Sequence, residues 1–507
     1  MKTERQSFAV WLTDKYILIM LLVFPLFTGM SGYRSITLSK YMFFVCATCA
    51  WLLLTAAYGV FSVIRRKDGI VYPDAPSIAV IVFMTVCCLS AVFSPFRESV
   101  FFGAGRYDGL ASLLLYGGIF LGCARYARLR PAHAAALGIS CTLCCAVAVL
   151  QLLDADVLKL FPSGMSYYDH GTFYTGEFLG TIGNTNLLSA YLCLCIPLFS
   201  ALFILGEGKR PWLFAVPVFP AVFVLTASGV AGGAVALCAC ALCAAPVLIT
   251  SRERLCRTAA ALTVICLAAG LALGFECSYE NRSAAFDFES AKALPAFLAA
   301  VLSFAAYGML KRPGAPRSDG RGYLRTILVL EGAAVAAGFA ALYFIPWSGG
   351  TAYELSRVLH GEINDSFGSS RIAIWKNVLA LVPERPLLGG GPDTLALRLD
   401  MRFSRYVPET GRTLSVYVDN AHNEYLGLLM NTGVLGLAAF LGCMVLTAGR
   451  LLTRRRDGIY AAFGLGLICY WVQAFFGLGL CITAPLMWIF WGMVCNYNIE
   501  GKNSQDE

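Results

Sequence analysis

The chain has 507 residues, of which 58% are hydrophobic and 14% are charged, and its mean hydropathy is +0.68. A soluble globular domain carries about 25% charged residues, so this composition excludes a soluble protein and indicates an integral membrane protein. The formal net charge is +8. Because the Lys and Arg residues stand between long apolar runs, we attribute them to membrane topology and expect no nucleic acid partner.

The apolar runs predict an all-α, polytopic membrane helix bundle, since one span needs about 20 residues. We expect about 14 spans, within a range of 11 to 14, in one membrane domain that covers residues 1–507. These runs are Tyr16–Gly32, Tyr41–Ile64, Ser77–Phe93, Gly109–Arg125, Ala132–Leu153, Asn186–Leu205, Trp212–Ala227, Gly229–Thr250, Thr258–Phe275, Ala291–Leu310, Thr326–Pro346, Glu424–Ala448, Gly458–Leu478 and Cys481–Tyr497. Met1–Lys15 is polar and no small-residue cleavage site follows the first run, which indicates an uncleaved signal anchor. The 20 cysteines lie almost entirely within apolar runs, where we interpret them as small core residues.

Basic residues alternate with the spans in a way that orients the chain. If the N-terminus is cytoplasmic, the inward loops contain clusters such as Arg65–Lys67 and Arg454–Arg456. Cytoplasmic loops are rich in Lys and Arg, so we expect both termini to face the cytoplasm of a bacterial cell. This orientation places Ser94–Asp108, Asp154–Thr185 and Trp347–Asn423 on the outer face of the cytoplasmic membrane.

The longest outer connection, residues 347–423, is predicted to carry the function, because long loops in compact bundles are usually functional or linkers. Its apolar periodicity predicts a short helix over Ser369–Leu381, which Pro383 and Pro386 end. The loop is also rich in cations: Arg357, Arg371, Lys376, Arg385, Arg398, Arg402, Arg405 and Arg412. Most of these fit a solvated surface, but Arg371 stands at the start of the predicted helix, where a guanidinium and backbone amides together suit phosphate.

The loop ends in the run Asp419–Leu426, which contains His422, one of only four histidines. A histidine at the boundary between loop and span can exchange protons near neutral pH. An unperturbed imidazole is protonated below a pH of about 6.5, so a base at this position would lose activity below that pH. Taken alone, an interfacial histidine is more often an anchor than a catalyst.

Three blocks of sequence give this histidine a context. The run His422-Asn423-x-x-Leu426-x-x-Leu429-x-x-x-Gly433-x-x-Gly436-Leu437 follows Ser370-Arg371-x-x-x-Trp375 and Pro386-Leu387-Leu388-Gly389-x-Gly391. Together the three blocks resemble the signature region of the O-antigen ligase and O-antigen polymerase family.

Two weaker blocks are similar to the same family, namely Gly183-Asn184-Thr185-Asn186 and Gly103-x-x-Arg106-x-x-Gly109. One position departs from it. The family often carries Thr-x-Ser-Arg at an outer span end, whereas this chain has Gly229 after Thr226-Ala227-Ser228, which puts one phosphate-binding cation in doubt.

The resemblance implies a membrane glycosyltransferase that transfers or polymerises a glycan from an undecaprenyl-pyrophosphate-linked donor onto an acceptor hydroxyl at the outer face of the membrane. His422 and Arg371 would be catalytic, with His422 as the base or orienting group for the acceptor. The donor pyrophosphate would bind Arg106, Arg371 and Arg398. Asn184, Asn186 and Asn423 would position sugar or phosphate oxygens, and their alternative role is helix capping.

The acceptor is left open by the sequence: a second lipid-linked glycan, a lipid or cell-wall glycan, or a protein hydroxyl fits equally, so ligase and polymerase are not separated. A transporter or flippase of lipid-linked saccharides is the main alternative, but such proteins usually have mid-membrane ionisable residues or broken helices, and Glu331 is the clear interior acid here. A non-catalytic scaffold would share the same pattern. Asp154-Ala155-Asp156 ends an apolar run, so we interpret its carboxylates as capping or interfacial groups and expect no metal and no cofactor.

Overall fold

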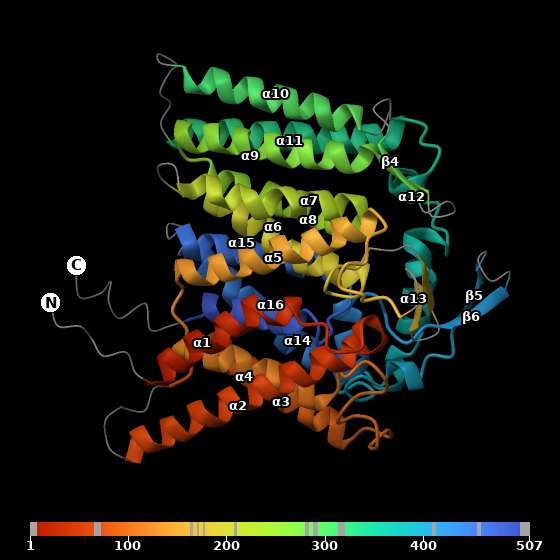
Figure 1. The fold of residues 1–507 in the computed structure, drawn as a ribbon. Coiled ribbons are helices and arrows are strands. Elements are labelled where there is room, and N and C mark those ends of the chain that lie inside the picture. Colours follow the sequence, from red (N-terminus) through yellow and green to blue (C-terminus); the bar gives the residue numbers. More distant parts are fainter. Residues whose placement is uncertain are drawn as a thin grey trace.

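The computed structural model describes residues 8–64, 72–162, 166–169, 172–175, 178–206, 210–278, 283–286, 293–312, 320–407, 412–453 and 458–496. Its long helices run side by side in one bundle (Figure 1). They are α1 (Phe8–Leu22), α2 (Ile36–Ile64), α3 (Ala75–Val92), α4 (Leu110–Tyr126), α5 (Pro131–Leu152), α6 (Thr185–Leu205), α7 (Ala215–Ala227), α8 (Ala231–Leu248), α9 (Arg252–Gly274), α10 (Leu294–Lys311), α11 (Gly320–Phe344), α14 (Glu424–Thr453), α15 (Gly458–Gln473) and α16 (Ala484–Val494). Within the described ranges, ten helical segments are long and apolar enough to cross a membrane, and four shorter apolar helices accompany them. The predicted all-α membrane bundle is confirmed.

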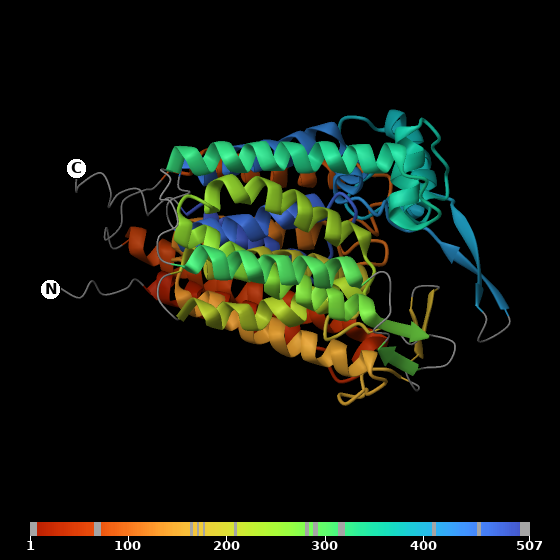
Figure 2. The ribbon, with the colours of Figure 1, turned by 90° about the horizontal axis from the view of Figure 1, so that it is seen from above.

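Short elements gather at one end of the bundle (Figures 1 and 2). The segment predicted as a large outer loop supplies α12 (Gly350–Leu359), α13 (Phe367–Ala380) and a hairpin of β5 (Arg402–Val407) with β6 (Arg412–Tyr417). The short helix expected over Ser369–Leu381 is therefore present as α13, whereas the hairpin was not predicted. Two further hairpins lie at the same end: β1 (Ser166–Asp169) with β2 (Thr172–Thr175), and β3 (Phe275–Ser278) with β4 (Ser283–Phe286).

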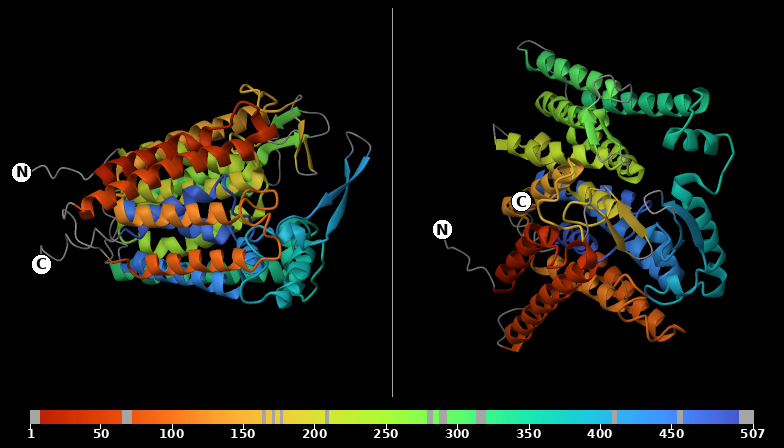
Figure 3. Two further views of the ribbon diagram at one scale, coloured as in Figure 1. Left: turned by 90° about the horizontal axis from the view of Figure 1, so that it is seen from below. Right: turned by 45° about the vertical axis from the view of Figure 1, so that its right-hand side comes forward.

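The centre of the bundle is α6, of whose 18-residue apolar window 83% is buried, whereas for α10 and α11 the share is 6%. The latter two form one edge of the bundle, at the top of the right-hand view in Figure 3. Between α4, α14 and α16, aromatic rings interlock around Trp488 and Trp491, whose ring centroids are 4.9 Å apart. Cysteines such as Cys123 and Cys141 are fully buried in this core, and no described cysteine forms a disulfide.

The first helix begins at Phe8, earlier than the predicted Tyr16, so part of the segment taken as a polar N-terminus is helical. Its acid, Asp14, has partners inside the bundle: Oδ1 lies 3.1 Å from Nε2 of the buried His133 and 3.5 Å from Arg130. Both partners stand at the start of α5. A charge that finds its partner on another helix cannot be recognised from its own segment, which explains the wrong boundary.

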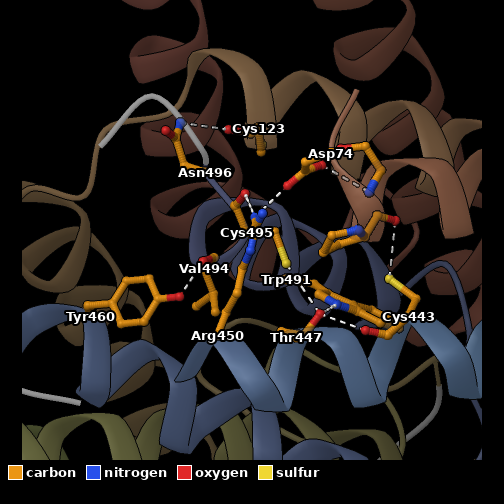
Figure 4. A network of polar contacts seen from close by, with 12 residues as sticks. Asp74, Cys123, Cys443, Thr447, Arg450, Tyr460, Trp491, Val494, Cys495 and Asn496 are labelled. Atoms are coloured by element: carbon orange, nitrogen blue, oxygen red, sulfur yellow. Dashed lines mark hydrogen bonds and ion pairs between the residues drawn. The ribbon is translucent and has the colours of Figure 1, made fainter. Parts of the chain in front are cut away.

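A polar clamp joins helix ends at one side of the core (Figure 4). Arg450 of α14 forms an ion pair of 2.5 Å with Asp74 and donates to the carbonyl of Cys495 at 2.8 Å. Asp74 also caps α3, accepting from the backbone N–H of Ser77. Asn496 donates to the carbonyl of Cys123 near the end of α4. The clamp therefore ties α3, α4, α14 and the end of α16 together.

The helix α14 is broken at Gly433, where the backbone has φ +68°. The Pro386–Gly391 segment lies along the break: Gly390 and Gly391 donate to the carbonyls of Met430 and Asn431, and Val434 donates to the carbonyl of Pro386. A Cβ at position 433 would lie 2.2 Å from the Leu387 carbonyl oxygen, so glycine is required. The sequence analysis did not predict this break.

Candidate active site

The run Asp419–Asn423 leads into α14 at the end of the bundle that carries α12 and α13. The Trp375 side chain of α13 donates to the Ala421 carbonyl at 3.0 Å, and the Asn420 side chain accepts from the backbone N–H of His422 at 2.9 Å. His422 itself has φ +48°, a left-handed conformation that non-glycine residues adopt at a cost of roughly 1–3 kcal/mol and that clusters at functional sites. The surrounding bonds therefore fix an unfavourable backbone geometry at this residue.

The His422 ring is surrounded by charged groups. Its pKa is lowered to about 4 by burial and by the positive charges of Arg106 and Arg371, with Asp419 acting in the opposite direction. The expectation of an unperturbed imidazole near pH 6.5 is therefore corrected, because the sequence alone does not reveal burial beside two guanidinium groups. At neutral pH the ring is uncharged and can accept a proton.

Arg106 lies in the loop before α4 and forms a two-pronged ion pair with Asp419, with Nε–Oδ2 and Nη2–Oδ1 distances of 2.6 and 3.0 Å. The structure thus joins two segments that are 313 positions apart in sequence. Asp419 was not predicted to have a role. Its signal was its place three residues before His422, but its partner is not visible in the sequence.

Arg371 follows three left-handed residues, Gly368 to Ser370, near the start of α13. Its Nη1 donates to the Gly368 carbonyl at 2.8 Å, while its Nε is buried without a hydrogen-bond partner. Burial lowers the pKa of this guanidinium, partly opposed by Glu354. One edge of a fixed, charged fork therefore remains available to an anion.

The other predicted residues have local roles. Arg398 is almost fully buried and donates to the carbonyls of Met430 and Leu381 and to Glu384. Asn184 caps α6 by accepting from the backbone N–H of Asn186 and Leu187, at 2.9 and 3.2 Å. Asn423 caps α14 by accepting from Leu426 at 3.1 Å. Of the predicted set, the structure brings together Arg106, Arg371 and His422, with Asn423 beside them in sequence.

Two further sequence interpretations concern positions outside this group. Gly229 has φ +64° just after α7 and a Cβ there would meet no atom within 4 Å, so it fits a glycine that ends a helix. Asp156 accepts from the backbone N–H of Phe161 at 2.9 Å, within the loop between α5 and β1 and away from a helix start. The basic clusters at 65–67 and 454–456 lie outside the described residues.

A cavity of about 50 Å³, which was not predicted, is lined by Asn420 and Asn423, on either side of His422 in the sequence. Its walls include three acids from distant segments, Asp108, Asp393 and Glu424, and the ring of Trp488. Burial and the nearby carboxylates raise the pKa of Asp108 well above its usual value. Burial also raises the pKa of Asp393 to about 6, against the lowering effect of the backbone N–H groups of Asp108 and Arg106.

Comparison with known proteins identifies part of this chain. Residues 216–441 match the family described as O-Antigen ligase. The chain carries an O-antigen ligase domain. The domain extends from α7 into α14 and contains Arg371, Arg398 and His422, whereas Arg106 and Asp108 belong to the preceding part of the chain. The family that the motifs suggested is confirmed, and with the membrane bundle it supports a glycosyltransferase type of activity.

Among solved structures, the chain is similar to an archaeal oligosaccharyltransferase AglB from Archaeoglobus fulgidus, in complex with an inhibitory peptide and a dolichol-phosphate. The identity is 12%, the TM-score is 0.31, and the match covers 83% of this chain and 49% of that chain. The chain thus spans about half the length of that protein. No curated protein matches the chain.

Proposed function

We propose that the protein is a glycosyltransferase that uses an undecaprenyl-pyrophosphate-linked glycan and an acceptor hydroxyl at the outer face of the cytoplasmic membrane. The observation that carries this proposal is an uncharged, partly buried His422 held within the field of two guanidinium groups, Arg106 and Arg371. Such a group combines a base for a hydroxyl with cations for a leaving pyrophosphate. Its position at an end of the bundle suits a donor whose lipid chain stays in the bilayer.

In the proposed reaction, the acceptor oxygen forms a bond to the anomeric carbon while the bond from that carbon to the pyrophosphate oxygen breaks. The electron pair of the broken bond goes to the pyrophosphate, and Arg371 stabilises the developing charge through its unpartnered Nε. The proton of the acceptor hydroxyl goes to His422. Arg106 contributes positive charge, but its Nε and Nη2 are engaged by Asp419, so we assign direct phosphate contact first to Arg371.

Arg398 is less suited to donor binding than the sequence analysis proposed. Its donors hold two carbonyls and Glu384, and a guanidinium used in this way would have to break those bonds to reach phosphate. We propose that it braces the loop behind the site. Asn184 and Asn423 would likewise contribute by fixing helix starts, since their side-chain oxygens already accept backbone N–H groups.

The test is to incubate the purified protein with an undecaprenyl-pyrophosphate-linked glycan and candidate acceptors, and to identify the new linkage in the product. Product formation that depends on His422 is the expected result, and it also separates ligase from polymerase through the acceptor that is used. Absence of any product with all acceptor classes, from a protein that is folded and binds pyrophosphate, would refute a transferase.

The proposed orientation is tested separately by single-cysteine labelling of intact cells, with the native thiols controlled. Asp400 has a side chain that is 89% exposed, so a cysteine there should react with an impermeant reagent, and one at position 66 should not. The reverse result would place the site on the cytoplasmic side.

A flippase for lipid-linked saccharides is the second candidate, and two observations favour it. The helix α14 is broken at Gly433, and ionisable side chains line a cavity next to that break, both of which occur in transporters. Reconstituted vesicles distinguish the two functions, because a flippase would move the donor across the bilayer without forming a new glycosidic bond.

A further inference from the structure

The cavity differs in chemistry from the two arginines that act on His422. Asp108, Asp393 and Glu424 lie in its walls together with the amides of Asn420 and Asn431. Among the described residues, no cationic side chain lines it. A carboxyl group in its ionised form repels phosphate, and its oxygens accept hydrogen bonds from hydroxyl groups in either protonation state, so the anionic part of a donor is disfavoured here.

Two polar atoms at the cavity are without partners. Oε2 of Glu424 and Oδ1 of Asn431 are inaccessible to solvent and have no hydrogen-bond partner. Leaving a buried acceptor unsatisfied costs about 1–3 kcal/mol, which a ligand with hydroxyl donors would recover. A Cβ at Gly479 would lie 2.8 Å from the Glu424 carboxyl carbon, so the absence of a side chain there leaves space beside this carboxyl.

The arrangement of the cavity walls suits a small polar group rather than a metal ion. Within the described ranges, no three His, Cys, Asp or Glu side chains converge as metal ligands do. The three acids are instead spread over the walls, and about 50 Å³ has room for a few groups the size of water. Tyr116 and Trp488 add aromatic surface, and Tyr116 donates to Oδ1 of Asp108 at 3.1 Å.

We propose that this cavity binds the hydroxyl-bearing edge of a neutral acceptor sugar, and thus forms the acceptor subsite of the transferase. The inference rests on the proposed function and deepens it, because it divides the site at His422 into an anion-binding side and a hydroxyl-binding side. The chain supports this division: Asn420, Asn423 and Glu424 line the cavity, while His422 between them lies in the field of the two arginines. In the proposed arrangement, a hydroxyl bound there would be presented to His422 from the cavity wall that its sequence neighbours form.

The test uses a glycine that opens onto the cavity. Gly427 lines the cavity, and a Cβ there would meet no heavy atom within 4 Å, so Gly427→Leu can extend a side chain from the cavity wall without a clash at its Cβ. Gly442 lies on the same helix, is not in the cavity lining, and is equally open, so Gly442→Leu is the matched control. Glu424→Gln removes the charge and keeps the shape.

The probes are a panel of neutral methyl hexopyranosides and inorganic pyrophosphate, with binding measured by saturation-transfer NMR on the purified full chain. We expect the wild type and Gly442→Leu to bind at least one pyranoside, and Gly427→Leu and Glu424→Gln to bind it about tenfold or more weakly. All four proteins should bind pyrophosphate equally, and Arg371→Ala should lose that binding while it keeps the pyranoside.

Two outcomes would overturn the inference: no pyranoside binds the wild type up to its solubility limit, or the two cavity variants bind as tightly as the wild type. Melting temperatures of the variants show whether a loss reflects unfolding. If pyrophosphate binding proved independent of Arg371, the proposed function would fail, and the pyranoside data would still decide the nature of the cavity.

Discussion

Replacing Arg371 by lysine keeps the positive charge and removes the planar guanidinium with its parallel N–H donors, so it isolates the contribution of guanidinium geometry. In the structure, Nη1 is held by the Gly368 carbonyl at 2.8 Å, which fixes the plane and leaves Nε buried without a partner. A lysine ammonium at the end of a flexible chain cannot both satisfy that carbonyl and present two parallel donors to a phosphate. The variant should therefore lose about one charge-assisted hydrogen bond in the transition state.

Such a bond contributes about 1.5–3 kcal/mol, which corresponds to a roughly 10- to 150-fold lower transfer rate. The assay is single-turnover transfer from the lipid-linked donor, with inorganic pyrophosphate binding measured in parallel. Arg357→Lys is the control, because Arg357 is a half-exposed arginine of the same loop that pairs with Glu362. A normal rate for Arg371→Lys would refute the role of the fork and leave Arg371 as a structural cation.

Three further predictions address the base, the role of metals and the polar clamp. His422→Ala should lower transfer by roughly a hundred- to ten-thousandfold without lowering the amount of folded protein. Because the neutral ring is the active form and its pKa is about 4, wild-type kcat/KM should stay constant below pH 6 and fall only toward pH 4. A pH profile with its midpoint near 6.5 would contradict the burial argument. Turnover should survive EDTA, and a loss that magnesium or manganese restores would move the assignment toward carboxylate-bound metal. Asp74→Asn keeps the cap on α3 but removes the ion pair with Arg450; the side chain of Asp74 is 14% exposed and that of Arg450 is 17% exposed. The free energy of unfolding in detergent should therefore fall by about 1–2 kcal/mol. An unchanged stability would show that the pair is not coupled to folding.

The spans were predictable because each depends on local composition. Runs such as Asn186–Leu205 and Ala132–Leu153 agree with α6 and α5 to within a residue or so. The predictions from sequence were wrong where a contact with a residue far away in the chain overrides the local sequence pattern. Asp14 enters a helix because Arg130 and His133 are its partners, and α14 breaks at Gly433 because the Pro386–Gly391 segment replaces its backbone hydrogen bonds.

The same reason separates the parts of the site that were predictable from those that were not. His422 and Arg371 stand out by residue type and by motif, and the structure brings them together with Arg106. The acidic cavity depends on Asp108, Asp393 and Glu424, which are far apart in sequence and belong to no shared pattern. Arg398, like Arg371, is an arginine of the cation-rich loop, and only its hydrogen bonds to the surrounding carbonyls show that it braces the loop.

The break at Gly433 also bears on how the protein responds to its lipid surroundings. The cavity wall from Asn423 to Asn431 belongs to the short piece before the break, and Gly390 and Gly391 bond that piece to the Pro386–Gly391 segment. A spanning helix tilts to match bilayer thickness, and here Val434 and Leu435, just after the break, donate to the carbonyls of Pro386 and Leu387. The same segment therefore holds both pieces of the helix, and Phe440 of the long piece also lines the cavity, so a change in bilayer thickness is passed to these residues.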